Sequence, residues 1–321
     1  MTRGGRKRED RAARAGWGRA LAVLRRHRAS LLRRSGVVAV DVGLRLRKRR
    51  ITKEVAIRVH VIEKVPDADL SASRRFPRSL EGVPVDVIEA RYRALECPFR
   101  STPLRIRRDV LEGGLALAAN PGSFGTLAAV AKDGAGGVFA LACAHVTTGS
   151  PGASVGQPGP EDPIGTVERA RLDSRMDAAL VRLDGSRGTA AGIRGIGPLG
   201  PVLDVRVPGA LPDIGLPIRI VGACSGRSRG RVTGLHASAR VEYPTGPITF
   251  RDQLHILADN PDGEEFSREG DSGALVVTRA GQRPVGVLFA GEAAGSGDFG
   301  LATPIVPVLE GLGVEFLGAT G

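Results

Sequence analysis

Alternating apolar and polar positions dominate the chain after residue 36, and this pattern predicts short β-strands rather than long helices. Turns rich in Gly, Pro and Asp separate the segments, with no helical pattern between most of them. The clearest segments are GTLAAVAK, GVFALACAHV, DAALVRL, GLPIRIVGAC, GRVTGLHA, ITFRDQLHILA, GALVVTR and PVGVLFAG. Such spacing predicts an all-β barrel or sandwich. Near the end, TPIVPVLEGL has the pattern of a terminal helix.

The N-terminal segment has a different pattern. Over residues 9–34, Trp17, Leu21, Leu24 and Leu31 recur at helical spacing, and arginines fill most of the other face. A basic amphipathic helix of this kind can lie on an anionic membrane or on nucleic acid. It can also be a solvated arm or a helix that docks on another subunit, so the sequence leaves these alternatives open.

Residues 36–98 predict a small sheet-containing module between this helix and the later strands. Two alternating runs, VVAVDVGLRLR and EVAIRVHVIEKV, are joined by the turn KRRIT. A third run, GVPVDVIEARY, covers 83–93 and follows a polar stretch with room for a short helix. His60 lies within the second run, where a structural histidine is expected rather than a ligand.

Composition and charge narrow the class of protein. The 321 residues include 45 Gly and 21 Pro but only 4% aromatic residues, which suits many short strands joined by turns. The net charge is +12, and residues 1–50 hold 17 Lys and Arg against three acidic residues. The basicity therefore belongs to the N-terminal arm, and an anionic partner, either nucleic acid or a membrane surface, is a hypothesis for residues 1–35.

The cysteines and the apolar runs indicate a reducing compartment. Cys97, Cys143 and Cys224 are too few and too scattered for a disulfide framework or a metal site. No apolar segment follows the basic N-terminus as a secretory signal requires, and no run reaches the roughly 18 residues of a membrane span. These features predict a cytoplasmic protein without a transmembrane segment.

Candidate chemistry centres on the stretch REGDSGALVV, residues 268–277, which places Ser272 on a Gly-rich turn before an apolar run. An activated serine needs a base within hydrogen-bond reach and a carboxylate to orient that base. Of the five histidines, His145 differs because it follows the apolar strand GVFALACA and precedes a loop. Asp177, directly before AALVRL, is the candidate carboxylate. Each signal alone also fits a structural turn or strand end.

Together, LACAHV, MDAALVRL and GDSGALVV resemble the His, Asp and Ser segments of chymotrypsin-like serine peptidases, in the same order. The resemblance covers residues 105–315 and implies two consecutive six-stranded antiparallel barrels with the site between them. The preceding module, with VVAVDVG, AIRVHVIEKVP and GVPVDVIEA, resembles the bacterial and plant group related to the plant Narrow Leaf 1 protein.

The resemblance implies a role for each site residue. Ser272 is the nucleophile, His145 the general base and acid, and Asp177 the residue that orients His145. The backbone N–H groups of Gly270 and Ser272 form the oxyanion hole. The residues expected to line the substrate cleft are Phe266, Phe289, Ala290 and Gly291.

The chain departs from the family pattern at three points. Val146 stands where secreted relatives have a disulfide-bonded cysteine, and RRDVLEGG (107–114) is only loosely similar to an activation-cleavage site. Activation by processing is therefore not expected, although Asp271 precedes the serine as in the family. Phe266, at the position that sets primary specificity, argues against a preference for Lys or Arg.

The sequence thus predicts an intracellular serine endopeptidase that needs no cofactor and no metal, acts on protein or peptide substrates, and is a possible homo-oligomer through its module. The predicted organisation is a basic helical arm (1–35), a small α/β module (36–100), a first barrel (101–200), and a second barrel with the C-terminal helix (201–321). An α/β-hydrolase is disfavoured, since residue 274 is Ala where Gly-x-Ser-x-Gly requires Gly. The alternatives are a peptidase fold kept as a binding or scaffold module, and a nucleic-acid or membrane protein that acts through its arm.

Overall fold

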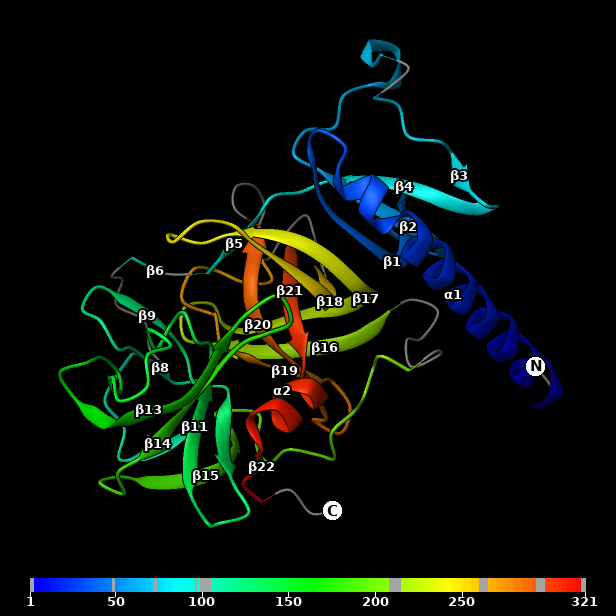
Figure 1. Ribbon diagram of the computed structural model, residues 1–321. Helices are drawn as coiled ribbons and strands as arrows, with labels where there is room; N and C mark the ends of the chain where they lie inside the picture. The colour runs from blue at the N-terminus through cyan, green and yellow to red at the C-terminus, as the bar shows by residue number, and fades with distance from the viewer. Residues whose placement is uncertain are drawn as a thin grey trace.

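The protein is mainly β, as the sequence predicts (Figure 1). Its structure is a computed structural model that describes residues 3–47, 50–71, 74–95, 97–98, 105–207, 215–259, 265–292 and 298–318, with side chains of residues 3–14, 67, 97 and 98 excepted. The thiol of Cys97 therefore lies outside the described residues.

The second half of the chain forms a closed six-stranded antiparallel barrel. Its strands pair in the order β16-β19-β20-β21-β18-β17, and β17 also pairs with β16 and closes the circle. Their bounds are β16 Leu216–Gly222, β17 Gly226–Glu242, β18 Ile248–Ala258, β19 Leu275–Thr278, β20 Pro284–Glu292 and β21 Phe299–Pro304. Helix α2 (Ile305–Leu312) follows β21 directly, as its pattern predicts, and ends at Gly313 in the left-handed conformation that glycine tolerates best.

The first half divides its described strands among three sheets. The largest has the order β12-β13-β14-β11-β10-β22, so that the C-terminal strand β22 completes it. A three-stranded sheet, β6-β9-β8, and a parallel pair, β15-β7, lie beside it. Their bounds are β6 Cys97–Pro98, β7 Val110–Gly113, β8 Ala116–Leu117, β9 Ser123–Thr126, β10 Ala129–Lys132, β11 Val138–Ala142, β12 Ser154–Gly156, β13 Pro163–Leu172, β14 Asp177–Leu183, β15 Gly188–Ile193 and β22 Glu315–Phe316. The expected uniform six-stranded antiparallel pattern is thus only partly present here.

The N-terminal strands extend the sheet of the second barrel. Strand β1 pairs with β17 through Ala39↔Ala239 and Gly43↔Gly234, and the order continues β1-β2-β4-β3. Their bounds are β1 Val37–Arg47, β2 Arg50–Val61, β3 Ser79–Leu80, β4 Val83–Glu89 and β5 Tyr92–Ala94, with a short 3₁₀ turn, η1, at Asp67–Asp69. The run that the sequence presents as one segment over 83–93 is therefore two strands, and β5 leaves the module.

Helix α1 (Arg3–Leu32) lies along β1, β2 and β4 (Figure 1). Trp17, Leu24 and Leu31 are buried in the cluster that also contains Val42 and Val59 of the strands beneath. The apolar face of α1 is therefore covered by the chain's own sheet. Neither helix of the described chain has an apolar run long enough to cross a bilayer.

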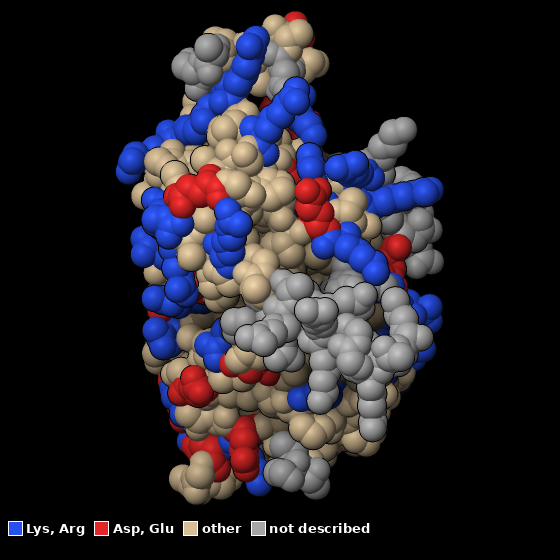
Figure 2. Space-filling view, turned by 90° about the vertical axis from the view of Figure 1, so that its right-hand side faces the viewer, with Lys and Arg blue, Asp and Glu red and all other residues tan. Residues whose placement is uncertain are grey.

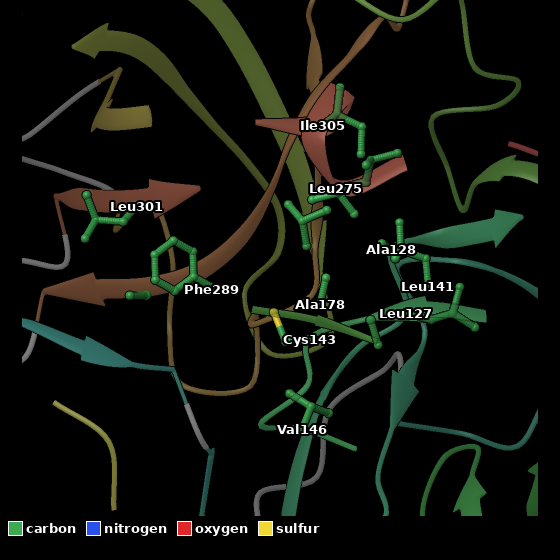
Figure 3. Packing of buried hydrophobic residues seen from close by; sticks show 14 of the residues in the cluster. Leu127, Ala128, Leu141, Cys143, Val146, Ala178, Leu275, Phe289, Leu301 and Ile305 are labelled. Carbon is green, nitrogen blue, oxygen red and sulfur yellow. The ribbon is translucent and has the colours of Figure 1, made fainter. Parts of the chain in front are cut away.

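Apolar side chains from both halves pack between them (Figure 3). Leu127 and Leu141 of the first half lie on one side of the cluster, and Phe289 of the second half lies on the other. Cys143 lies between them, fully buried. Burial of this kind contributes about 25 cal/mol for each Å² of apolar surface removed from water, so the cluster joins the two halves firmly.

A ring of buried polar contacts joins the module to the second barrel. Arg58 donates from Nε to Asp41 Oδ1 (2.7 Å) and from Nη1 to Thr233 Oγ1 (3.2 Å), whose hydroxyl contacts His255 Nδ1 at 3.3 Å. The Tyr92 hydroxyl lies 3.1 Å from His255 Nε2 and 2.9 Å from His60 Nδ1. His60 Nε2 lies 3.6 Å from Asp41 Oδ2 and completes the ring. We name these six residues the polar ring: Asp41, Arg58, His60, Tyr92, Thr233 and His255. His60 is structural, as expected.

The polar ring makes stability depend on pH. Burial, with the Arg58 charge nearby, lowers the pKa of His255 well below 6.5. Below about pH 6.5 the unfolded chain therefore binds a proton that native His255 does not, and stability falls as the pH drops. We expect the free energy of unfolding to fall by up to about 2 kcal/mol between pH 7 and pH 5 from this group. Urea unfolding of the wild type and of His255→Gln over this range measures the effect, and equal pH slopes for the two proteins would contradict it.

Asp41 should cause a second decrease in the free energy of unfolding, at lower pH. Burial opposes its charge, but the Arg58 guanidinium holds the pKa of Asp41 well below its ordinary value. Its contribution to stability is complete above about pH 4 and is lost as the pH falls further.

Candidate active site

His145 and Asp177 lie together, as predicted. His145 follows β11 on a turn that Thr147 holds, with its hydroxyl donating to Ala144 O at 3.2 Å. Asp177 is the first residue of β14, which pairs with β11 through Ala142↔Ala179. The imidazole Nδ1 is hydrogen-bonded to Asp177 Oδ2, and the His145 backbone N–H donates to Asp177 Oδ1 at 3.2 Å. This pairing fixes the ring and directs Nε2 away from the carboxylate.

Tyr243 adds a contact from the other half of the molecule. Its hydroxyl donates to Asp177 Oδ2 at 2.9 Å, and its ring meets the His145 ring edge to face, with the centroids 5.5 Å apart. Asp177 is fully buried, so these donors supply the hydrogen bonds that its charge needs away from water.

Ser272 lies on the predicted turn ahead of β19 and meets the His145 loop through β9. The Thr126 backbone N–H donates to Ser272 O at 2.7 Å, and Thr126 Oγ1 donates to Gly270 O at 2.9 Å. A Cβ on Gly125 would come within 2.7 Å of both Ser272 O and Val146 Cγ1. Glycine at 125 therefore lets the nucleophile turn approach the residue next to His145.

Asp271 holds the nucleophile turn from beneath. Its Oδ1 accepts the backbone N–H groups of Cys224 (2.9 Å) and Ser225 (3.0 Å), and Oδ2 accepts that of Arg268 (2.8 Å). Burial raises the pKa of this carboxyl, and the backbone donors act against that shift. Three backbone donors of the chain itself thus bind the Asp271 carboxylate and fix the nucleophile turn above it.

The predicted cleft residues fall into two places. Phe289, Ala290 and Gly291 lie on β20 beside the nucleophile turn, and Ser272 Oγ donates to Phe289 O at 2.9 Å. Phe266 is fully buried, and its ring fits against Gly230 and Gly300, where a Cβ would lie 2.9 and 3.0 Å from ring carbons. Phe266 is therefore packed against β17 and β21 inside the second barrel.

The described neighbours of Ser272 and Gly270 include a segment that the sequence did not place there. Leu95 N donates to Ser272 Oγ at 3.2 Å, and Gly270 N donates to Leu95 O at 2.7 Å. The Leu95 side chain, 2% exposed, lies against Gly291. Both predicted elements, the nucleophile and one oxyanion donor, thus contact the same residue.

Cys143, His145 and Asp177 also offer metal-ligating atoms within 4.8 Å of one another. Thiolate, not thiol, is the form of cysteine that binds metals. Burial and then the charge of Asp177 raise the pKa of Cys143 well above its ordinary value, and its Sγ lies 3.4 Å from Leu288 O as a donor. In the absence of a metal, Cys143 is therefore a protonated thiol that donates to Leu288 O.

Sequence reasoning missed Tyr243, Thr126 and Leu95. Tyr243 is one of only two tyrosines, and it follows the alternating run of β17, but nothing in that pattern indicates the partner of its hydroxyl. Thr126 and Leu95 act through backbone groups and close packing, which any residue type can supply.

Solved structures share the fold of this chain. The fold matches Thermobifida fusca Protease A with a TM-score of 0.50 and 21% identity, over 66% of this chain and all of that one. The chain has the chymotrypsin-like serine peptidase fold. A glutamic acid-specific serine protease with the same fold matches 64% of this chain and all of its own, with a TM-score of 0.50 and 20% identity.

Among curated proteins, the chymotrypsin-like chain resembles Protein NARROW LEAF 1 of Oryza sativa subsp. japonica, with 28% identity over 326 residues. The match covers 85% of this chain and 54% of the relative, so the chain spans about half the length of the curated relative it matches. No family model matches the chain.

Proposed function

We propose that the protein is a serine endopeptidase that hydrolyses peptide bonds through an acyl-enzyme, with Ser272 as nucleophile, His145 as base and Asp177 as the orienting acid. The hydrogen bond between His145 Nδ1 and Asp177 carries this proposal, because it sets the tautomer that a base on Nε2 requires. The chymotrypsin-like fold around that pair supports the same conclusion.

In this mechanism Ser272 Oγ attacks the carbonyl carbon of the substrate while His145 takes its proton. The proton then passes to the leaving amine, the C–N bond breaks, and water hydrolyses the acyl-enzyme by the same route. The N–H groups of Gly270 and Ser272 would stabilise the oxyanion, and loss of one such donor typically costs about 3 kcal/mol. Residues 289–291 of β20 would pair with an extended substrate strand.

We expect a fluorophosphonate probe, after long incubation with the full chain, to form an adduct on Ser272, which peptide mass spectrometry locates. Ser238→Ala serves as a matched control, since Ser238 is a buried serine of β17 that pairs with Val40 of β1 and has no role in the mechanism. That variant should keep the adduct, and Ser272→Ala should lose it. A chain that folds by circular dichroism and forms no adduct in any variant would refute the peptidase proposal.

A binding or scaffold protein with little activity is the second candidate. Full burial of Ser272 and its contact with Leu95 favour it over a constantly open enzyme. The probe experiment separates the two, because a scaffold needs no reactive serine.

The cytoplasmic location, the anionic partner of residues 1–35 and the homo-oligomer through the module stay predictions. Over residues 15–32, whose side chains the structure describes, the apolar face of α1 is buried and its charged face is the one open to such a partner. Lys and Arg side chains are spread over the face of the molecule in Figure 2, with Asp and Glu between them. An anionic surface would therefore bind by charge rather than by insertion of the helix.

A further inference from the structure

A strand of the chain itself pairs with β20, the strand that is predicted to bind the substrate. Strand β5 pairs antiparallel with β20 through Ala94↔Ala290, Arg93↔Gly291 and Tyr92↔Glu292. Antiparallel pairing with an exposed strand is the general way in which an extended peptide is bound through its backbone. The partner strand here contains the three residues 289–291 that the peptidase proposal assigns to substrate.

The residue after β5 is placed as the acyl residue of a substrate would be. The carbonyl oxygen of Leu95 accepts the Gly270 N–H at 2.7 Å, and its own N–H lies 3.2 Å from Ser272 Oγ. Ser272 Oγ therefore contacts the peptide N–H on one side of Leu95, and the predicted oxyanion donor Gly270 contacts the carbonyl on its other side.

The Leu95 side chain packs against Gly291, one of the predicted cleft residues. A Cβ on Gly291 would lie 2.8 Å from Leu95 Cδ2 and 3.0 Å from Ser267 Oγ, so the glycine lets the Leu95 side chain pack closely against β20. Leu95 and Phe266 belong to one buried apolar cluster. The residue that this region holds is therefore branched, apolar and of medium size.

Beyond Leu95 the chain follows the other side of the site. Strand β6 pairs antiparallel with β9 through Cys97↔Phe124 and Pro98↔Ser123. Strand β9 is the element whose Thr126 holds the nucleophile turn. Backbone pairing on both sides of the Leu95 carbonyl is what a bound substrate would show. Figure 1 shows β5 beside the second half of the molecule and β6 beside the first.

Two further contacts anchor this segment. Tyr92, at the start of β5, is a member of the polar ring, with its hydroxyl near His60 and His255. Arg93 forms an ion pair with Glu269, next to Gly270. Ser272 Oγ donates its proton to Phe289 O at 2.9 Å. The segment is thus held at Tyr92 and Arg93, directly before the residues that meet the site.

We propose that β5, Leu95 and β6 form an internal inhibitor that binds across the active site as a substrate does, with Leu95 in the primary specificity pocket. The inference rests on the proposed peptidase function. It assigns the substrate class as peptides with leucine or a similar apolar residue before the scissile bond. Activity then requires this segment to leave the site.

The test compares the full chain with Leu95→Gly and Arg93→Ala, each measured for its rate of fluorophosphonate labelling. Leu95→Gly empties the specificity region and should label about 10-fold faster or more, because the rate follows the fraction of molecules with an open site. Arg93→Ala loses only the ion pair, so its increase should be smaller. Arg91→Ala, which removes the same charge from an exposed position just before β5, should label at the wild-type rate.

Substrate profiling of the faster variant tests the specificity. Fluorogenic peptides ending in Ala-Leu should be cleaved about 10-fold or more faster than those ending in Ala-Lys or Ala-Glu, since one wrong residue in an apolar pocket costs about 1–3 kcal/mol. If the Leu95→Gly variant does not fold, the labelling test can still be made with Arg93→Ala. The Arg93 side chain is 43% exposed, so its removal leaves the core intact.

Three results would overturn the inference. If the wild type labels quickly and neither Leu95→Gly nor Arg93→Ala labels faster, the segment does not block the site and the peptidase function stands. If wild-type chains are found cut after Leu95 while Ser272→Ala chains are intact, the segment is a substrate and not an inhibitor. If no folded variant labels, the peptidase function itself fails, and the inference fails with it.

Discussion

Replacing Ser272 or His145 by alanine should lower kcat for peptide hydrolysis by about 10⁶-fold, and the double variant should be no slower than either single one. The two residues act as a unit, since the serine without its base is a weak nucleophile and the base without the serine has no proton to take. The measurement uses an Ala-Leu fluorogenic peptide and whichever is more active, the wild-type or the Leu95→Gly chain.

Asp177→Asn should lower kcat by less than Ser272→Ala or His145→Ala does. The amide keeps the shape of the buried site but favours the wrong tautomer of His145, so a fall of about 10⁴-fold is expected. Ser238→Ala, at a buried serine of β17 opposite Val40, should remain within a few-fold of its parent. Losses that multiply in the Ser272→Ala, His145→Ala double variant would mean that the two side chains act independently, and the proposed triad would then be wrong.

Asp41→Ala should lower the free energy of unfolding by about 3–5 kcal/mol, the usual cost of removing one partner of a buried ion pair. Asp41 and Arg58 are both fully buried, and the alanine leaves the guanidinium with Thr233 Oγ1 at 3.2 Å but no carboxylate. The arginine cannot move aside, because Gly43 and Gly234 lie directly against its guanidinium. Chemical denaturation of the full chain measures the loss.

Glu54→Ala is the matched control for this prediction. Glu54 pairs with Arg45 at 2.9 Å on the surface, with side chains 41% and 30% exposed. Exposed pairs of this kind contribute about 0–1 kcal/mol, so this variant should remain close to the wild type. A loss below about 1 kcal/mol for Asp41→Ala would show that the Arg58 charge finds solvent, contrary to its burial here.

The alternation of apolar residues predicted most strands that position the site, because every second side chain of a half-buried strand faces the core and is apolar. The segments GVFALACAHV and DAALVRL became β11 and β14, whose pairing brings His145 to Asp177. Motif order then predicted that Ser272 belongs with them. These features lie within short stretches of sequence, where periodicity and turn chemistry are informative.

Pairing between distant strands could not be predicted in the same way. The run over 83–93 contains both β4 and β5, and nothing in its pattern marks the break at Ala90 after which Tyr92 turns toward β20. Likewise, Asp41 and His255 belong to one polar ring although 214 positions separate them in sequence. Contacts of that kind depend on which strands become neighbours, and a single sequence carries no measure of that choice.

The pairing of β1 with β17 bears on where the protein can be divided. Strand β16 pairs with residues 226–232 of β17, and β1 pairs with residues 234–239 along the same edge. A chain that lacked β1 would leave the backbone N–H and C=O groups of that second stretch without their partners. Unpaired strand backbone of this kind allows other chains to add to it. The N-terminal region is therefore an integral layer of the peptidase-like body, and the smallest separable unit of this protein begins at or before Val37.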